Sequence, residues 1–186
     1  MGKIYFISDL HLFHDRQFIF KPRGFDSVVD MNNTIAENWG RIITDEDDIY
    51  ILGDLVLNDT NGGLDILRNL KGKIHIIRGN HDTDNRMQAY RTIPNVVEIC
   101  DGRFLRYKDY HFFLTHFPCL TGNLEKESLK QMTLNIFGHT HSKDKFYEDR
   151  PYMYNVACDA QNCTPICIDD IIEQMIAKVE ECKEKL

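Results

Sequence analysis

Short apolar runs of three or four residues recur along the chain, and each is rich in β-branched or aromatic side chains. Runs of this length and composition predict strands that are buried on at least one face. The five clearest runs are Ile4–Ile7, Ile49–Leu52, Ile74–Ile77, Phe112–Leu114 and Leu134–Phe137. A second group of strands has the spacing of hairpins, with Asp101–Gly102 as a suitable turn. Its members lie around Val96–Ile99, Phe104–Tyr107 and Tyr152–Val156.

Helical periodicity separates the early strands. Apolar residues three or four positions apart form one stripe over residues 28–43 and another over residues 64–70. The clearest helix ends the chain, at about 169–185, where Asp169 or Asp170 can cap the first turn. Helices between strands, followed by a partly antiparallel second half, indicate an α/β protein. Because no linker-like stretch divides it, we expect residues 1–186 to form a single domain with this helix packed on it.

The composition excludes several classes of function. With 42% hydrophobic and 27% charged residues, this chain of 186 residues has an ordinary globular composition. Its net charge of −7 argues against a generic electrostatic grip on nucleic acid or on an anionic membrane. No apolar run approaches the roughly 18 residues of a membrane helix, and the first residues do not resemble a signal peptide. We therefore expect a cytoplasmic protein.

The six cysteines form no Cys-x-x-Cys pair, and we expect them to be reduced in a cytoplasmic protein with a good core. A thiolate metal site built from Cys158, Cys163 and Cys167 is an alternative, which their irregular spacing disfavours. The eight histidines are the more informative feature of this acidic chain.

Polar side chains follow each of the five clear strands, at the point where the strand ends. The segments are Ser8-Asp9-Leu10-His11, Gly53-Asp54, Gly79-Asn80-His81-Asp82, Thr115-His116 and Gly138-His139-Thr140-His141. In open α/β sheets, ligands bind outside the carboxyl ends of the strands. Leaving Asp82 aside, five converging ends would place two carboxylates, one amide and five imidazoles in one crevice. This combination predicts a metal centre.

The spacing and the donor types suit a pair of metal ions. Asp9 and His11, like His139 and His141, are two residues apart, so both side chains of a pair can leave an extended segment from the same face. Oxygen and imidazole donors without thiolate suit Mn, Fe, Zn, Co or Ni, among which we favour Mn. Eight candidate groups exceed the need of one ion, whereas two divalent ions about 3.5–4 Å apart that share a carboxylate use them naturally.

This series of residues resembles the calcineurin-like metallophosphoesterase family in order and in rough spacing, and most of all its small bacterial and phage phosphoesterases. The resemblance implies an α/β/β/α sandwich, in which two mixed sheets are flanked by helices and the metals lie at one edge. It also implies seven metal ligands. The first metal would be held by Asp9, His11 and His141 and the second by Asn80, His116 and His139, with Asp54 as the bridge.

His81 matches the catalytic histidine of that family. A hydroxide that bridges the two metals would attack phosphorus, because bound cations lower the pKa of water from about 15.7 to near 7. His81 would then protonate the leaving group as a general acid, a role worth about 10²–10⁴ in rate. The Asn80 amide can ligate a metal through its oxygen and offer its N–H to the phosphate. Asp82 either orients neighbouring groups or ties down its loop.

Other polar residues allow two readings each. His14 and Arg23 are candidate substrate-binding residues, with a surface histidine and a solvated arginine as the alternatives. His75 and His111 lie inside strand runs and are interpreted as structural. Arg78 serves a strand end or the rim of the site. Substrate choice is expected to depend on the loops at residues 12–27, 56–63, 83–95 and 117–131, with ordinary connections as the alternative.

These features predict a dinuclear metal-dependent phosphoesterase that hydrolyses a small phosphorylated substrate, with phosphodiesterase capability. Two alternatives stay open: a nuclease of the same family, and a metal-binding scaffold without catalysis. The nuclease is disfavoured by the short chain and its charge of −7, which offer no extended grip on nucleic acid. The scaffold is disfavoured because all seven candidate ligands and His81 are present.

Overall fold

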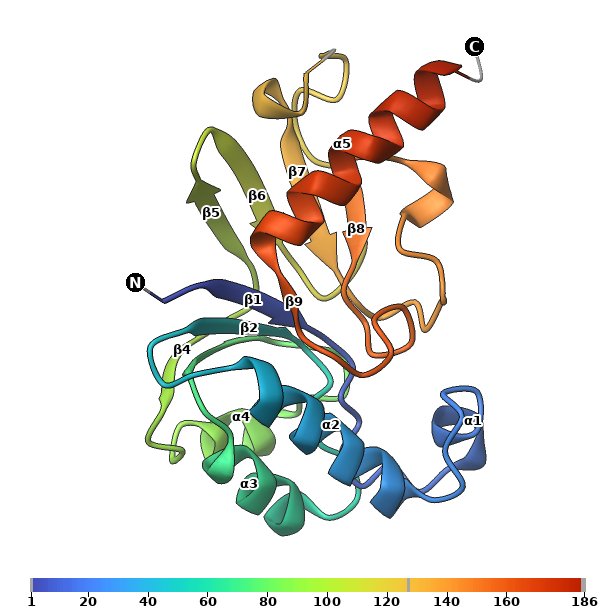
Figure 1. The fold of residues 1–186 in the computed structure, drawn as a ribbon. Helices are drawn as coiled ribbons and strands as arrows, with labels where there is room; N and C mark the ends of the chain where they lie inside the picture. The colour runs from blue at the N-terminus through green and yellow to red at the C-terminus, as the bar shows by residue number, and fades with distance from the viewer. Residues whose placement is uncertain (1, 127, 185–186) are drawn as a thin grey trace.

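Two β-sheets flanked by helices make up residues 2–126 and 128–184, the part of the chain that the computed structural model describes (Figure 1). The first sheet has the order β4-β3-β2-β1-β9, formed by β1 (Ile4–Ile7), β2 (Asp48–Leu52), β3 (Lys73–Ile77), β4 (Val96–Cys100) and β9 (Ile166–Cys167). The second has the order β5-β6-β7-β8, formed by β5 (Arg103–Tyr107), β6 (Tyr110–Leu114), β7 (Thr133–Phe137) and β8 (Met153–Asn155). The helical elements are α1 (Gln17–Phe20), α2 (Val28–Ile42), α3 (Thr60–Asn69), α4 (Asp84–Tyr90), α5 (Ile168–Glu184) and the short 3₁₀ turns η1 (Leu129–Gln131) and η2 (Tyr147–Asp149).

Both sheets are mixed. β1, β2, β3 and β4 run parallel, and β9 pairs antiparallel with β1. In the second sheet β6, β7 and β8 run parallel, and β5 is antiparallel to β6. The five clear apolar runs lie in β1, β2, β3, β6 and β7. The predicted fold of two mixed sheets with flanking helices is thereby confirmed.

The alternation of side chains along the strands separates two hydrophobic cores. On β1, Tyr5 and Ile7 join the first core, in which α2, α3 and α4 cover the sheet with side chains such as Trp39. Phe6 points the other way and joins the second core, which contains residues of both sheets, among them Phe112. α5 adds to this second core its buried residues Ile168, Ile171, Ile172 and Met175. The apolar stripes predicted over residues 28–43 and 64–70 therefore contribute buried side chains to the first core.

The turn at Asp101–Gly102 does not make the expected hairpin. β4 pairs in parallel with β3 at the edge of the first sheet, whereas β5 pairs with β6 in the second sheet. Asp101–Gly102 is thus the crossing between the sheets, and the hairpin turn lies at Lys108–Asp109, between β5 and β6. Tyr152–Val156 is no hairpin strand either, because β8 pairs in parallel with β7. A local turn signal predicts where the chain bends but not which strands pair.

The terminal helix α5 begins one residue earlier than predicted. Asp169 and Asp170 lie inside its first turn, so neither caps it from outside, although their charges suit the positive end of the helix dipole. Residue 185 of the predicted range lies outside the described residues. Neither α5 nor any other helix in the described part of the chain combines the length and the apolar character needed to cross a membrane.

Hydrogen bonds between the end of β1 and the segment after β8 join the two sheets. Ser8 donates its backbone N–H to the Val156 carbonyl at 2.9 Å, and Cys158 donates its own to the Ser8 carbonyl at 2.9 Å. We call this pair of bonds the seam. Because β1 and β8 belong to different sheets, the seam brings the carboxyl ends of parallel strands from both sheets to one place.

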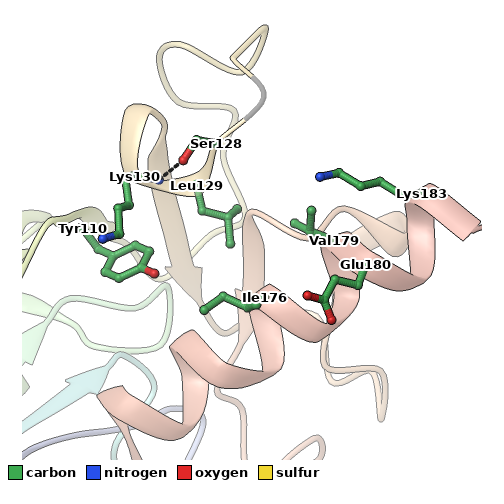
Figure 2. A pocket seen from close by; sticks show the side chains of 8 residues that line it. All are labelled: Tyr110, Ser128, Leu129, Lys130, Ile176, Val179, Glu180 and Lys183. Atoms are coloured by element: carbon green, nitrogen blue, oxygen red, sulfur yellow. Dashed lines mark hydrogen bonds between the residues drawn. The ribbon is translucent and has the colours of Figure 1, made fainter.

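A surface groove separates α5 from β6 and η1 (Figure 2). Its volume is about 300 Å³, and Tyr110 and Lys130 border it on one side and Ile176 and Val179 on the other. None of the predicted site residues lines this groove. The predicted chemistry therefore lies elsewhere, at the seam.

Leu134→Ala is expected to lower the free energy of unfolding by about 2–5 kcal/mol, because Leu134 is fully buried in the second core and its loss leaves a cavity. Leu120→Ala is the matched control. It removes the same atoms from a side chain that is 64% exposed, so the change should stay within about 0.5 kcal/mol. Urea unfolding followed by circular dichroism measures both variants, and equal losses would contradict the assigned core.

Candidate metal centre

Loops that follow five strands converge beside the seam. They carry Asp9 and His11 after β1, Asp54 after β2, Asn80 and His81 after β3, His116 after β6, and His139 and His141 after β7. Among the described residues, two groups of three place their donor atoms within 4.8 Å of one another. The groups are Asp9, His11, His141 and Asp9, Asp54, His116. Two metal-competent groups that share one carboxylate therefore lie at the edge of the sheets.

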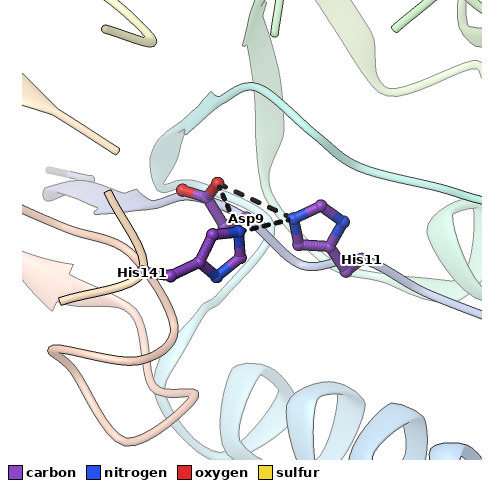
Figure 3. Close-up of side chains that lie close together, drawn as sticks. All are labelled: Asp9, His11 and His141. Atoms are coloured by element: carbon purple, nitrogen blue, oxygen red, sulfur yellow. Dashed lines mark hydrogen bonds and ion pairs between the residues drawn. The ribbon is translucent and has the colours of Figure 1, made fainter. Parts of the chain in front are cut away.

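Figure 3 shows the first group from close by. His11 Nε2 lies 3.1 Å from His141 Nε2, and both nitrogens lie 3.8 Å from Asp9 Oδ1. Separations of this size occur between ligands of one ion, whose donor atoms lie about 2.0–2.2 Å from the metal. Asp54 Oδ2 lies 3.8 Å from His11 Nε2 and 3.5 Å from His116 Nε2. Asp54, itself a member of the second group, thus also approaches a ligand of the first, and its role as the bridge stays a prediction.

Asn80 and His139 stand next to the second group. The Asn80 side-chain oxygen lies 2.9 Å from His116 Nε2. The rings of His139 and His116 are 5.0 Å apart between centroids, and the backbone N–H of His139 donates to Asp9 Oδ2 at 2.8 Å. Both residues are neighbours of the second group, and their ligation of a metal stays a prediction.

A cavity of about 430 Å³ opens beside the first group, and we call it the His81 cavity. His11, His14, Phe18, Asn80 and His81 are among the residues that line it. The His81 ring meets the His11 ring edge-on at 5.5 Å, and its backbone N–H donates to Asp54 Oδ1 at 2.8 Å. His14 Nδ1 lies 3.4 Å from His11 Nδ1. The structure thus brings His14 and His81 into one cavity with the candidate ligands.

Five of the seven candidate ligands have a left-handed backbone conformation. They are Asp9 (φ 55°), His11 (φ 48°), Asp54 (φ 55°), His139 (φ 69°) and His141 (φ 50°). Such a conformation costs a residue other than glycine of order 1–3 kcal/mol, and it persists only where the surroundings impose it. This concentration of strain at strand ends marks the site independently of its side chains.

Two of the glycines that precede candidate ligands are required by close approach. Gly53 has a φ of +91°, and a Cβ at this position would crowd Nδ1 of His116. A Cβ at Gly138 would overlap the Ser8 hydroxyl and the Asp9 carboxylate. Glycine is therefore required at both positions by close approach, and at Gly53 also by its backbone conformation.

Hydrogen bonds at Nδ1 of two imidazoles direct their Nε2 atoms toward other candidate ligands. His116 donates from Nδ1 to the Leu52 carbonyl at 2.7 Å, and His141 donates from Nδ1 to Asp159 Oδ2 at 3.0 Å. A proton held at Nδ1 leaves the lone pair at Nε2. Partners of this kind orient the ring and increase its basicity as a ligand.

Arg23 is not where a substrate clamp would be. Its guanidinium donates to Asp159 Oδ2 at 2.7 Å and to the Asp9 carbonyl at 2.9 Å. Only 1% of its side chain is exposed, and it does not line the His81 cavity. The expected substrate contact, and its solvated alternative, are both replaced by a buried ion pair behind the ligands. Asp159, which sequence reasoning missed, is the centre of this arrangement because it joins Arg23 to His141.

Asp82 ties the loops after β2 and β3 together. Its Oδ2 accepts the backbone N–H of Asp54 at 2.8 Å and of Gly79 at 2.9 Å. Its Oδ1 accepts the N–H of Leu55 at 3.2 Å and the hydroxyl of Tyr90 at 3.1 Å. Asp82 therefore holds its own loop and, through the same carboxylate, orients the loop that carries Asp54.

The environment shifts several pKa values in the site. Burial raises the pKa of Asp9, and the charges of His116 and His141 oppose this without cancelling it. Burial also disfavours the ionised form of Asp54, but the hydrogen bond and charge of His116 outweigh it and lower its pKa to about 2. Burial lowers the pKa of His11 to about 2, which keeps its imidazole neutral, as a metal ligand must be.

The donor atoms fit divalent cations because nitrogen and oxygen donors converge here and one buried carboxylate oxygen has no hydrogen-bond partner in the described part of the chain. Asp9 Oδ1 is buried and has no hydrogen-bond partner among the described residues. His116 Nε2 lies beside the side-chain oxygens of Asn80 and Asp54, so one nitrogen and two oxygen donors also converge there. An unpaired buried polar atom costs about 1–3 kcal/mol, and more when it is charged. Cations at these points would remove that cost, so the residues fit the predicted metals.

The remaining histidines lie apart from the two groups. His75 Nε2 lies 2.9 Å from Asp48 Oδ1 and its Nδ1 lies 3.1 Å from Glu98 Oε2, which confirms its structural interpretation. His111 is exposed on β6, so it is not the structural strand residue that was expected. In the described part of the chain, neither metal-competent group includes any of the buried cysteines Cys158, Cys163 and Cys167.

Paired carboxylates and imidazoles at the shared edge of two mixed sheets form a candidate histidine–aspartate metal site. The family model for the calcineurin-like phosphoesterase superfamily domain matches residues 3–157. This segment contains all seven candidate ligands and His81. The chain therefore belongs to the calcineurin-like phosphoesterase superfamily.

The chain is similar to proteins of archaea, phages and bacteria over most of its length. It is 31% identical over 184 residues to an uncharacterised protein of Methanocaldococcus jannaschii, which covers 93% of this chain and 91% of that protein. It is 26% identical over 209 residues to the gene 66 protein of Mycobacterium phage D29, covering 97% and 99%. A solved protein of unknown function from Aquifex aeolicus matches with a TM-score of 0.72 and 25% identity, covering 93% of this chain and 99% of that one.

Asp159→Asn should weaken metal binding about 10–100-fold, because it removes the charge that accepts the Nδ1–H of His141. Calorimetric titration of the metal-free protein with Mn²⁺ measures the affinity. Asp109→Asn is the matched control, since it also breaks an ion pair, with Lys130, but on the surface. Thermal melting verifies that each variant is folded. Unchanged affinity in a folded Asp159→Asn protein would exclude the positioning role of Asp159.

Proposed function

We propose that this protein is a dinuclear metal-dependent phosphoesterase that hydrolyses a phosphate ester, with phosphodiesterase capability. The observation that carries the proposal is the pair of overlapping groups that share Asp9 at the seam. Two adjacent cation sites suit phosphoryl transfer, in which charge develops on the attacking and the leaving oxygens. Membership of a phosphoesterase superfamily supports the same class of reaction.

Seven residues would hold the two metals. They are Asp9, His11 and His141 for the first, Asn80, His116 and His139 for the second, and Asp54 between them. When bound, such ions supply Lewis-acid activation of water and of the phosphoryl group. Carboxylate, amide and imidazole donors suit Mn, Fe, Zn, Co and Ni, and among these we propose manganese.

His81 is the proposed general acid. It lines the His81 cavity, and the bond from its backbone N–H to Asp54 Oδ1 fixes its position relative to the ligands. As imidazolium it would give its proton to the alkoxide that leaves phosphorus, which spares the site from releasing a strong base. The cavity is of a size that admits a small ester.

Asn80 and His14 are proposed to orient the phosphate. Asn80 lines the His81 cavity, and its amide can offer N–H donors to a phosphoryl oxygen while its oxygen faces His116. His14 contacts His11 through Nδ1, so its Nε2 is left for the substrate. Both side chains would thus contact the phosphate from the wall of the His81 cavity, and neither would contact the nucleophile.

Turnover of model esters after metal reconstitution tests the proposed reaction. The metal-free protein is loaded with Mn²⁺, Fe²⁺, Zn²⁺, Co²⁺ or Ni²⁺ and assayed with bis(p-nitrophenyl) phosphate and with p-nitrophenyl phosphate. We expect cleavage of the diester and two metal equivalents per chain. Asp54→Asn is the control, because it removes the carboxylate charge that lies close to both His11 and His116. If no metal raises turnover above this variant, the protein is not a phosphoesterase.

His81→Ala should lower the turnover of a diester with an alcohol leaving group about 10²-fold or more while both metals stay bound. The loss should be smaller when the leaving group is p-nitrophenol, whose weakly basic anion needs little protonation. A merely structural role would affect both esters equally. His111→Ala, which removes an exposed histidine of β6, is the matched control. Full activity of His81→Ala on both esters would remove His81 from the acid role.

A further inference from the structure

A second cavity adjoins the candidate metal centre on the side of the second metal group. Its volume is about 520 Å³, and Asn80 and His116 are part of its wall. Asn80 also lines the His81 cavity, so the two cavities meet at this residue. We call the second one the Phe117 cavity. A phosphate held at the metal centre would therefore have one cavity for each of two substituents.

Two phenylalanines, Phe113 and Phe117, line the Phe117 cavity together with His116. Phe117 is 50% exposed, and its ring meets the rings of His139 at 4.5 Å and His116 at 5.0 Å. Phe113 also lines the cavity and is itself stacked on Phe104 at 4.5 Å. Aromatic rings that stay open to solvent beside a reactive centre offer a stacking surface to a planar group.

The charges of the same wall give no reason to expect a further anion there. Arg78 pairs with Asp84 at 2.7 Å and donates to the Asp82 carbonyl at 2.9 Å, so its guanidinium already has partners. Asp101, another residue of the wall, adds a negative charge. A second phosphate would therefore meet one compensated cation and one carboxylate. An uncharged group suits this cavity better than an extended polyanion does.

We propose that the Phe117 cavity binds an uncharged aromatic group of a phosphodiester, namely the substituent that stays on phosphorus. This inference rests on the proposed function, because the proposed acid, His81, lines the other cavity. The departing alcohol must lie near the acid that protonates it, which leaves the Phe117 cavity to the retained substituent. A nucleoside or an aryl group has the required chemistry, and a short alkyl group does not.

Binding of two phosphonates tests the aromatic site without any turnover. Phenylphosphonate and methylphosphonate carry the same anion, and their carbon substituent cannot leave. Calorimetry with the Mn²⁺-loaded protein should show that phenylphosphonate binds about tenfold or more tightly than methylphosphonate, because its ring is buried against Phe117. Phe117→Ala should remove this preference. Phe18→Ala, the matched control, removes a ring of similar exposure from the His81 cavity and should keep it.

A second variant covers the case in which Phe117→Ala disturbs the ligands that Phe117 touches. Cys119→Trp keeps the Phe117 ring and fills the cavity from another wall residue. It should abolish the preference for phenylphosphonate while methylphosphonate still binds. Metal analysis of each variant shows whether two equivalents are retained.

Equal affinities of the unmodified protein for the two phosphonates would overturn the proposal, as would the binding of neither. If Phe18→Ala loses the preference and Phe117→Ala keeps it, the aromatic group binds in the His81 cavity, and the proposal is overturned as well. Turnover of methyl p-nitrophenyl phosphate separates this result from the proposed function. Turnover without a phenyl preference keeps the phosphoesterase and removes the aromatic site, whereas a phenyl preference without turnover of any ester keeps the aromatic site and removes the enzyme.

Discussion

The seam between Ser8 and residues 156–158 is the contact on which the rest of the structure depends. It connects the end of β1 in the first sheet to the chain that follows β8 in the second. Carboxylates come from the first sheet at Asp9 and Asp54, whereas the imidazoles of His116 and His141 come from the second. The Ser8 hydroxyl also donates to the Leu52 carbonyl at 2.6 Å, which secures β2 at the same point. Because these bonds hold the two sheets together at this edge, Asp9 lies close to ligands from both sheets and can belong to both metal groups.

The strained ligands are held by one another's backbones. Asp9 donates its N–H to the Gly53 carbonyl at 3.0 Å, and His11 donates to the Asp54 carbonyl at 3.0 Å. Each such bond contributes about 0.5–1.5 kcal/mol, similar to the cost of one left-handed residue. The loops after β1 and β2 therefore stabilise each other's conformation. Asp82, in the loop after β3, also accepts the backbone N–H groups of Asp54 and Gly79. Rigid placement of this kind is what a pair of cations a few ångströms apart demands.

The parts of the fold that depend on local pattern were predictable, and the parts that depend on pairing were not. Apolar runs and the polar residues after them are local features, so the strands and the residues that meet at the seam followed from the sequence, and the family resemblance added their roles. The prediction of a hairpin at Asp101–Gly102 was wrong because strand pairing is set by contacts between residues distant in the sequence. Asp159 was missed although it too follows a strand, because β8 is only three residues long and its partner Arg23 lies 136 residues away. Arg23 was misplaced for the same reason.

The seam also determines at which stage of synthesis the complete site can form. Asp9 emerges from the ribosome early, but the bond that closes the edge requires Cys158, and the support of His141 requires Asp159. At about 5–20 residues per second, the first ligands wait roughly 10–30 s for these partners. During that time the loop that carries Asp9 and His11 lacks the partners that the chain after β8 supplies. A nascent chain that stalls before residue 156 therefore lacks both the bonds of the seam and the support of His141.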